Sequence, residues 1–305
     1  MRIAIIGLGL IGGSAGLAWR AAGHTVAGYA RRTATAHRAL ARGAIDEIVP
    51  TLPEAARAEV VLLAPPVLAI RELLAHLAPH LAPGTIVTDV ASTKQCVEQW
   101  ARQLLPPGVR FVGGHPMAGK ETAGIEHAEA ALFRGRTWCL VPPPAADPGA
   151  VEVVRRLVLD AGACPLLINA AEHDRAVAAT SHLPFTASAA LCRAVIAQPG
   201  FAALAPVAAS GLRDVTRLAS GDPLMHRDIC LTNRDNLVRE LEAYADHVRE
   251  LADLIRHLPE PEAAEQSEVT ARLEALFVAA KQARDAWLAQ SVEQGDAGLR
   301  LRGSS

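Results

Sequence analysis

The sequence has 305 residues, half of them hydrophobic, and a formal net charge of −2 at pH 7. This length suits one large domain or two ordinary ones, and the balanced charge argues against nucleic acid as a partner. The five scattered cysteines contain no C-x-x-C pair, which argues against a disulfide framework and a zinc site and fits a reducing compartment. Without a long apolar span, a cytoplasmic protein with no membrane partner is predicted.

The first half of the chain alternates short apolar runs with helical patterns. Strands are predicted at RIAIIGLG, TVAGYA, VVLLAPP, TIVTDVAS, RFVGGHP and TWCLVPP, and helices at Ile11–Ala22, ATAHRALARG and Val67–Leu81. This alternation predicts an α/β fold with a doubly wound parallel sheet. A further helix and CPLLINA complete a first domain over residues 1–170.

Beyond residue 170 the strand signal disappears. Helices are predicted at Ala171–Thr180, Pro184–Ile196, Phe201–Arg217, Pro223–His257 and Glu262–Gln290. The last of them carries apolar residues on one helical face. We therefore expect an all-α domain over residues 171–295 and a flexible tail over residues 296–305.

A glycine-rich turn follows the first strand. Gly7, Gly9 and Gly12 form the pattern G-x-G-x-x-G between a strand and a helix, which is the context of a dinucleotide-binding turn. The backbone N–H groups of such a turn bind a pyrophosphate at the helix N-terminus. The alternative is a glycine-rich turn that binds nothing.

The end of the second strand, GYARRTAT, bears on the choice of cofactor. NAD sites usually carry an acidic residue there for the ribose 2′-hydroxyl, but Ala30 occupies the position and Arg31 and Arg32 follow. Guanidinium groups bind phosphate bidentately, so NADP is favoured over NAD. The alternative is a solvated arginine pair in a protein that accepts NAD. The predicted cofactor-binding residues are Gly7, Gly9, Leu10, Ile11, Gly12, Arg31, Arg32, Pro65 and Ser92.

Four segments contain polar residues that a plain core does not need. They are DVASTK (Asp89–Lys94), GGHPMAGKETAG (Gly113–Gly124), HDRAVAATSHLPF (His173–Phe185) and SGLRDVTRLASGDPLMHRDI (Ser210–Ile229). The first two follow sheet strands, at the edge where doubly wound folds bind ligands. A site made from all four would lie in a cleft between the two domains.

These segments together with GLGLIGGS resemble the prephenate/arogenate dehydrogenase family of tyrosine biosynthesis. The match spans Met1 to about His257, and all blocks occur in the family's order. The resemblance implies a Rossmann domain followed by a helical dimerisation domain, and hence a homodimer. It also implies oxidative decarboxylation of prephenate or arogenate, to 4-hydroxyphenylpyruvate or tyrosine, with hydride transfer to NADP or NAD.

The resemblance assigns the chemistry to particular residues. His115 matches the family's catalytic histidine, and a neutral histidine suits the base that accepts the substrate's hydroxyl proton. Ser92 matches a serine that contacts this histidine and the substrate; by itself it is more typical of a helix N-cap. Arg217 matches an arginine that binds a substrate carboxylate. Read without the resemblance, these residues would be a turn histidine, a cap and a surface arginine.

Four more residues are predicted at the substrate. His182 matches a second active-site histidine, and Glu121 matches a residue at the site entrance. Lys120 is assigned to the substrate mouth because the chain has only three lysines. His226 stands where several relatives have tryptophan, so it is either a carboxylate ligand or a surface residue. Some relatives also have histidine at the position of Phe185, and these departures leave the choice between prephenate and arogenate open.

Two other readings remain. A β-hydroxyacid dehydrogenase would need a helical lysine as its acid, and Lys281 is the only lysine in the second half. A non-catalytic NADP sensor would need the cleft but not His115, Ser92 and Arg217 together. No segment shows the pattern of an ACT regulatory domain, so none is expected.

Overall fold

The computed structural model describes residues 1–120 and 122–300, except for the side chains of residues 264–266 and 291–300. It divides into two units, Met1–Leu237 and Val238–Ser305. All described strands lie in the first unit, together with every segment singled out above for polar residues. The expected flexible tail, residues 296–305, is only partly described: helix continues to residue 300 and residues 301–305 lie outside the description.

The first unit is built on a sheet of eight strands in the order β3-β2-β1-β4-β5-β6-β7-β8. The strands are β1 (Arg2–Ile6), β2 (Thr25–Tyr29), β3 (Glu47–Ile48), β4 (Val60–Leu63), β5 (Ile86–Asp89), β6 (Arg110–Pro116), β7 (Thr137–Val141) and β8 (Cys164–Leu167). From β3 to β6 all neighbours pair in parallel. The predicted doubly wound fold is confirmed, with the reversal of strand order between β1 and β4.

One strand runs against the prediction. TWCLVPP was expected to extend the parallel sheet, but β7 pairs antiparallel with β6 and places His115 opposite Cys139. A parallel pair needs a crossover, usually a helix, and the segment from β6 to β7 contains only the 3-10 turn η2 (Ile125–His127) in its described part. Helix α6 (Pro148–Asp160) then provides a crossover, so β8 lies parallel to β7.

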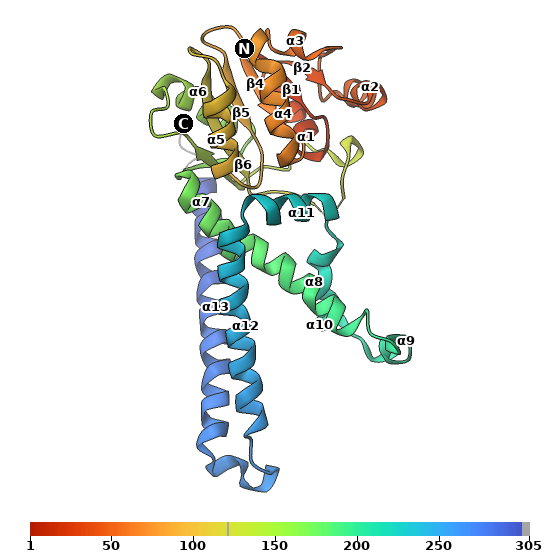
Figure 1. Ribbon diagram of the computed structural model, residues 1–305, viewed down its shortest axis with the longest axis vertical. Helices are drawn as coiled ribbons and strands as arrows, with labels where there is room; N and C mark the ends of the chain where they lie inside the picture. The colour runs from red at the N-terminus through yellow and green to blue at the C-terminus, as the bar shows by residue number, and fades with distance from the viewer. Residues whose placement is uncertain (121, 301–305) are drawn as a thin grey trace. The chain divides into compact units, whose positions relative to one another are not determined.

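Helices cover both faces of the sheet. Ile3 and Ile5 pack with α1 (Leu10–Ala21), α2 (Thr33–Ala41) and α6, whereas Ala4 and Ile6 pack with α3 (Leu52–Ala55), α4 (Val67–Leu77) and α5 (Gln95–Leu104). Because successive strand residues point to opposite faces, a strand buried on both sides is apolar throughout. Figure 1 shows α4 and α5 side by side on one face.

A long helical segment leaves the sheet after β8. It consists of α7 (Ala170–Val177), a π-helical turn (Ala178–His182) and α8 (Leu183–Val195). Pro184 has no N–H to donate to the carbonyl of Thr180, which explains why the regular ladder is interrupted there. π turns inside helices are frequent at functional sites, and this one ends on His182.

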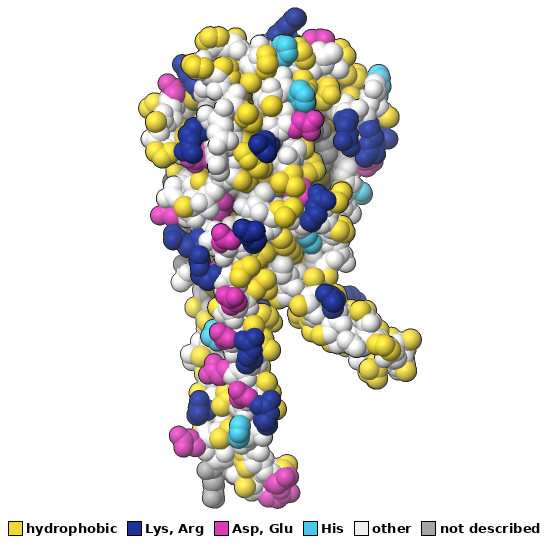
Figure 2. Space-filling view, viewed as in Figure 1, with side chains coloured by type: hydrophobic (Ala, Val, Ile, Leu, Met, Phe, Trp, Pro, Cys, Tyr) yellow, Lys and Arg dark blue, Asp and Glu magenta, His cyan; other side chains and the backbone are white. Residues whose placement is uncertain are grey.

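The rest of the first unit is an arm of short helices. It comprises α9 (Phe201–Leu204), a 3-10 turn (Ala205–Val207), α10 (Ser210–Thr216), a 3-10 turn (Arg217–Ser220) and α11 (Pro223–Thr232). Hydrophobic side chains gather on the surface of α8–α10 (Figure 2); Leu204 is 61% exposed and Val207 82%. The single helix expected over Pro223–His257 is broken at Asn233, where α12 (Arg234–Arg256) follows.

The second unit contains most of α12, a 3-10 turn (Pro261–Gln266) and α13 (Glu268–Arg300). Both helices expose apolar side chains, among them Ile255 on α12 and Phe277 on α13, which are 52% and 54% exposed. Within the described residues, no helix has the length and apolar character needed to cross a membrane.

Candidate active site

The glycine-rich turn joins β1 to α1 and is tightly packed at two of its three glycines. A Cβ on Gly7, whose φ is +106°, would lie 2.7 Å from the carbonyl carbon and oxygen of Ala64, beside Pro65. A Cβ on Gly12 would lie 2.0 Å from the carbonyl oxygen of Gly7. These two positions therefore accept only glycine, for reasons internal to the protein.

Gly9 differs from these two. A Cβ there would meet no protein atom within 4 Å, so packing of the described chain does not require a glycine. Gly9 is also the N-cap of α1, and neither a side-chain cap nor an acidic first turn occupies that helix end. Leu10 and Ile11 form its first turn. Open space beside uncapped N–H groups is what an approaching pyrophosphate requires.

The residues after β2 lie at the same edge of the sheet. Arg31 and Arg32 are exposed, and no ion pair with another described residue engages either guanidinium. Arg32 is the N-cap of α2 but makes no side-chain cap bond. Two uncommitted cations therefore stand at the end of β2, where dinucleotide-binding folds hold the ribose.

A buried ion pair ties the ends of β5 and β6 together. Lys94 Nζ donates to Asp89 Oδ2 and, at 2.6 Å, to the carbonyl oxygen of Gly114, and both charged side chains are almost fully buried. The other carboxylate oxygen of Asp89 accepts the N–H of Gly114 at 3.2 Å. A Cβ on Gly114 would lie 2.6 Å from the carbonyl oxygen of Asp89, so the glycine permits this approach. The pair thus holds the backbone immediately before His115.

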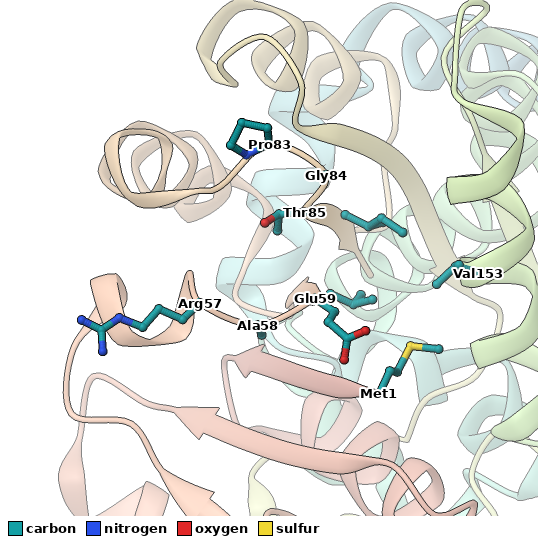
Figure 3. Close-up of a pocket in the computed structure, with 10 residues that line it drawn as sticks. Met1, Arg57, Ala58, Glu59, Pro83, Gly84, Thr85 and Val153 are labelled. Carbon is teal, nitrogen blue, oxygen red and sulfur yellow. The ribbon is translucent and has the colours of Figure 1, made fainter.

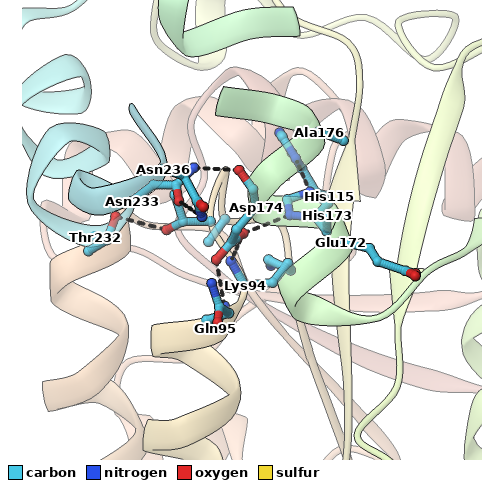
Figure 4. A network of polar contacts seen from close by, with 12 residues as sticks. Lys94, Gln95, His115, Glu172, His173, Asp174, Ala176, Thr232, Asn233 and Asn236 are labelled. Carbon is cyan, nitrogen blue, oxygen red and sulfur yellow. Dashed lines mark hydrogen bonds and ion pairs between the residues drawn. The ribbon is translucent and has the colours of Figure 1, made fainter. Parts of the chain in front are cut away.

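His115 stands near the carboxyl end of β6 and is only 9% exposed. Its Nδ1 lies 2.9 Å from Nε2 of His173, and Nδ1 of His173 lies 2.8 Å from Oδ1 of Asp174 (Figure 4). Burial holds the pKa of His115 well below its usual value, with further lowering by His173, Lys94 and His182. The ring is therefore neutral at pH 7, as a general base must be.

Asp174 connects α7 to the start of α5. Its two oxygens accept the N–H groups of Lys94 at 2.7 Å and of Gln95 at 2.9 Å. A carboxylate at a helix N-terminus is stabilised by the helix dipole. Asp174 thus caps α5 from another element, so the alternative reading of Ser92 as the cap is wrong. Ser92 lies half-buried in the β5–α5 loop, and no hydrogen bond to a described residue engages its hydroxyl.

His182 is the second buried histidine of the cluster. Its Nδ1 lies 3.2 Å from Nδ2 of Asn233, which also donates to the carbonyl oxygen of Asp174 at 2.7 Å. Because Nδ2 is a donor, Nδ1 of His182 accepts and Nε2 carries the proton. Among the described residues this buried Nε2 has no partner. Burial is the main cause that lowers the pKa of His182 to about 4.

An aromatic stack lies next to His182. Phe185 is 6.0 Å from His182, centroid to centroid, and stacks on His226 at 4.1 Å. Burial lowers the pKa of His226. A Cβ on Gly221 would lie 2.7 Å from the His226 ring, so this glycine provides the space for it.

The remaining predicted substrate residues lie outside this buried cluster. Arg217 is exposed at the end of α10, where the following 3-10 turn packs on α8. Lys120 forms an ion pair with Glu129 at 2.6 Å, in a partly exposed position. Glu121 lies outside the described residues.

Sequence reasoning assigned no role to four residues of this cluster: Asp89, His173, Asp174 and Asn233. The first three lie within the motifs DVASTK and HDRAVAATSHLPF, but adjacency in sequence does not reveal hydrogen-bond partners. Lys94 was conspicuous as one of three lysines. Asn233 carried no signal, because it stood inside a segment predicted to be continuous helix.

A separate hollow of about 440 Å³ lies at the opposite edge of the sheet (Figure 3). Residues at the amino ends of β4 and β5 line it, with Arg57 and Glu59 as its charged side chains. None of the predicted site residues contributes to it. The cluster at the carboxyl ends, rather than this hollow, is the candidate active site.

Two protein-family models match the chain. Residues 15–166 fit the family model described as "Prephenate dehydrogenase, nucleotide-binding domain", and residues 169–269 fit "Prephenate dehydrogenase, dimerization domain". The prephenate dehydrogenase of Bacillus subtilis is 36% identical over 270 residues, covering 86% of this chain and 71% of the relative. A cyclohexadienyl dehydrogenase of Zymomonas mobilis is 32% identical, covering 83% and 88%.

Solved structures agree in fold. Arogenate dehydrogenase from Synechocystis is 34% identical with a TM-score of 0.78, covering 94% of this chain and 100% of that one. Prephenate dehydrogenase from Aquifex aeolicus, in complex with hydroxyphenyl propionate and NAD+, is 28% identical with a TM-score of 0.82, covering 92% and 98%.

Proposed function

We propose that this chain, which belongs to the prephenate dehydrogenase family, oxidises and decarboxylates prephenate or arogenate in tyrosine biosynthesis, with a nicotinamide cofactor as hydride acceptor. The observation that carries the proposal is the buried ring of His115 at the carboxyl end of β6, where burial lowers its pKa. Its Nδ1 is engaged by His173, and no bond to a described residue engages Nε2. Nε2 is therefore the atom that takes the substrate's hydroxyl proton.

The reaction needs one base, one hydride acceptor and a fixed orientation of the ring. The cofactor, when bound, accepts hydride from the carbon that carries the hydroxyl group. His115 removes the hydroxyl proton as this carbon becomes a carbonyl, and carbon dioxide leaves from the opposite ring carbon. Aromatisation of the ring drives the step. Water must be excluded, and the buried cluster of His115, His173 and His182 suits that requirement.

The cofactor fits the turn after β1. The open space at Gly9 and the uncapped start of α1 suit a pyrophosphate. Exposed Arg31 and Arg32, with Ala30 in place of an acid, favour NADP over NAD. Pro65 lies beside Gly7, just beyond the end of the neighbouring strand β4, and Ser92 follows β5 on the same edge.

Several side chains are assigned to the substrate. The unpartnered Nε2–H of His182 is a buried donor for a substrate oxygen. The His226–Phe185 stack offers a flat apolar surface beside it. Following the family pattern, Arg217 supplies a guanidinium for a carboxylate and Glu121 is assigned to the entrance. Lys120 is assigned to the substrate mouth because it is one of only three lysines.

The helices beyond β8 form a cytoplasmic homodimer in this proposal. The arm exposes Leu204, Val207 and Val215, and α13 exposes Phe277, each more than half exposed in the single chain. Apolar side chains in such numbers mark a surface that another chain covers. Sedimentation of the purified protein measures the oligomeric state, and a monomer at micromolar concentration would contradict this part.

The test of function is absorbance at 340 nm with prephenate and arogenate, each crossed with NADP and NAD. Turnover with at least one pair is expected, with NADP preferred. His115→Asn should lower kcat by about 10²- to 10⁴-fold, the usual contribution of a general base, while cofactor binding persists. Cofactor binding without turnover on any pair would instead favour a sensor.

A further inference from the structure

The polar chain behind His115 has a defined hydrogen-bond direction. It runs from His115 through His173 to Asp174, over contacts of 2.9 and 2.8 Å, and the three side chains are at most 9% exposed. Neither His173 nor Asp174 is needed to contact a substrate or cofactor in the proposed reaction. Their burial on α7, next to the end of β6, requires another explanation.

The direction follows from the chemistry of the carboxylate. Asp174 accepts two backbone N–H groups at the start of α5, from Lys94 on one oxygen and from Gln95 on the other, so both of its oxygens act as acceptors. His173 must then donate from Nδ1, and in the neutral ring this leaves a lone pair on Nε2. His115 in turn must donate from Nδ1 to that lone pair. Its own lone pair is thereby placed on Nε2.

We propose that His173 and Asp174 are positioning residues that hold His115 in the tautomer with the proton on Nδ1, so that Nε2 is always the free base. The inference rests on the proposed function for its catalytic consequence. The tautomer itself is a property of the protein without substrate.

The surroundings of His115 explain why its tautomer has to be held by a partner. The other charged or titratable groups of the cluster are engaged elsewhere or lie to one side. Lys94 and Asp89 form their own pair, and Nδ1 of His182 is occupied by Asn233. Cys139 lies across from His115 on β7. Among the described residues, only His173 forms a hydrogen bond with the His115 ring. Without His173, both neutral tautomers would be populated, and the tautomer protonated on Nε2 cannot accept the substrate's proton.

The first measurement is ¹⁵N NMR of the full-length protein labelled at histidine, without substrate, at neutral pH. His115→Asn identifies the His115 signals. A proton on Nδ1 and none on Nε2 is expected. A proton on Nε2 of His115 would overturn the proposal whether or not the enzyme turns over either substrate, which separates this inference from the proposed function.

The second measurement compares two variants of His173. In His173→Gln the amide oxygen can reach the place of Nε2 and accept from His115, whereas His173→Phe keeps a planar ring without an acceptor. We expect His173→Phe to lower kcat by about 10- to 100-fold, as for other groups that orient a catalytic histidine, with His173→Gln restoring most of it. KM for the cofactor should be unchanged, because its site is made by other elements.

A merely structural role would give a different pattern. Both variants would then lower kcat alike, in proportion to lost stability, and leave the His115 tautomer unchanged, which would overturn the proposal. If His173→Phe does not fold, the decision rests on His173→Gln. Nδ1-protonated His115 in that variant, with kcat within a few-fold of wild type, supports the proposal, and any other tautomer contradicts it.

Discussion

His226 lies flat against Phe185, with ring centroids 4.1 Å apart and planes inclined by 3°. The two residues come from α11 and α8. The stack lies beside the buried His182, the side chain that the proposed function assigns to the substrate.

Gly221→Ala should disturb this stack while leaving both of its rings unchanged in sequence. The new methyl group would lie 2.7 Å from the His226 ring, while φ at Gly221 is ordinary for alanine. If the stack contacts the substrate, KM rises by about 2- to 10-fold, the equivalent of an aromatic pair worth roughly 0.5–1.5 kcal/mol. Steady-state kinetics measure this. The control is Gly211→Ala, whose Cβ meets nothing within 4 Å; an equal effect there would contradict the interpretation.

Lys94→Met should destabilise the fold strongly. It leaves the buried carboxylate of Asp89 without its partner, which costs about 3–5 kcal/mol in the free energy of unfolding. Chemical denaturation measures the loss. The double variant Lys94→Met/Asp89→Asn removes both charges and should recover part of it.

The matched control for that prediction is another lysine in an ion pair. Lys281 pairs with Asp285 on the surface of α13, with 76% of the lysine side chain exposed. Lys281→Met should therefore change the free energy of unfolding by at most about 1 kcal/mol. Equal losses for the two lysines would show that burial of the Lys94 pair has no special energetic role.

His182 should make stability depend on pH. Its pKa is about 4 in the folded chain and near 6.5 in the unfolded one, so the unfolded state binds more protons between these values. Stability therefore falls as pH falls through this window, by about 2 kcal/mol between pH 7 and pH 5 from this residue. His182→Asn should remove that part of the slope. Denaturation at the two pH values tests it, and an unchanged slope would show that His182 is not buried as a neutral ring.

The double variant Arg31→Ala/Arg32→Ala should lower kcat/KM for NADP much more than kcat/KM for NAD. Charge-assisted bonds to a 2′-phosphate are worth about 1.5–3 kcal/mol, so kcat/KM for NADP should fall by roughly 10- to 100-fold while that for NAD changes little. Arg38→Ala serves as control, because Arg38 is an exposed arginine of α2 already paired with Glu126. Equal losses with NADP and NAD would argue that the pair does not read the 2′-phosphate.

Local pattern was enough to predict most of the first unit. Continuous apolar runs such as VVLL predict strands buried on both faces, and the glycine turn between β1 and α1 predicts a nucleotide-binding end. The direction of β7 was missed, because strand direction depends on the connection and not on the strand's own residues. The break at Asn233 was missed for a similar reason: its side chain is engaged by residues more than 50 positions away.

By itself, then, the sequence determined the doubly wound sheet and the order of the motifs, because both depend on residues that are neighbours along the chain. The family resemblance carried by those motifs, rather than any local pattern, pointed to His115 as the candidate base. Tertiary structure alone decided what surrounds that base. Lys94 pairs with Asp89, Asp174 caps α5 from α7, and His173 stands between Asp174 and His115. Hydrogen-bond direction and burial arise only where distant segments meet, and they decide which nitrogen of a histidine holds the proton.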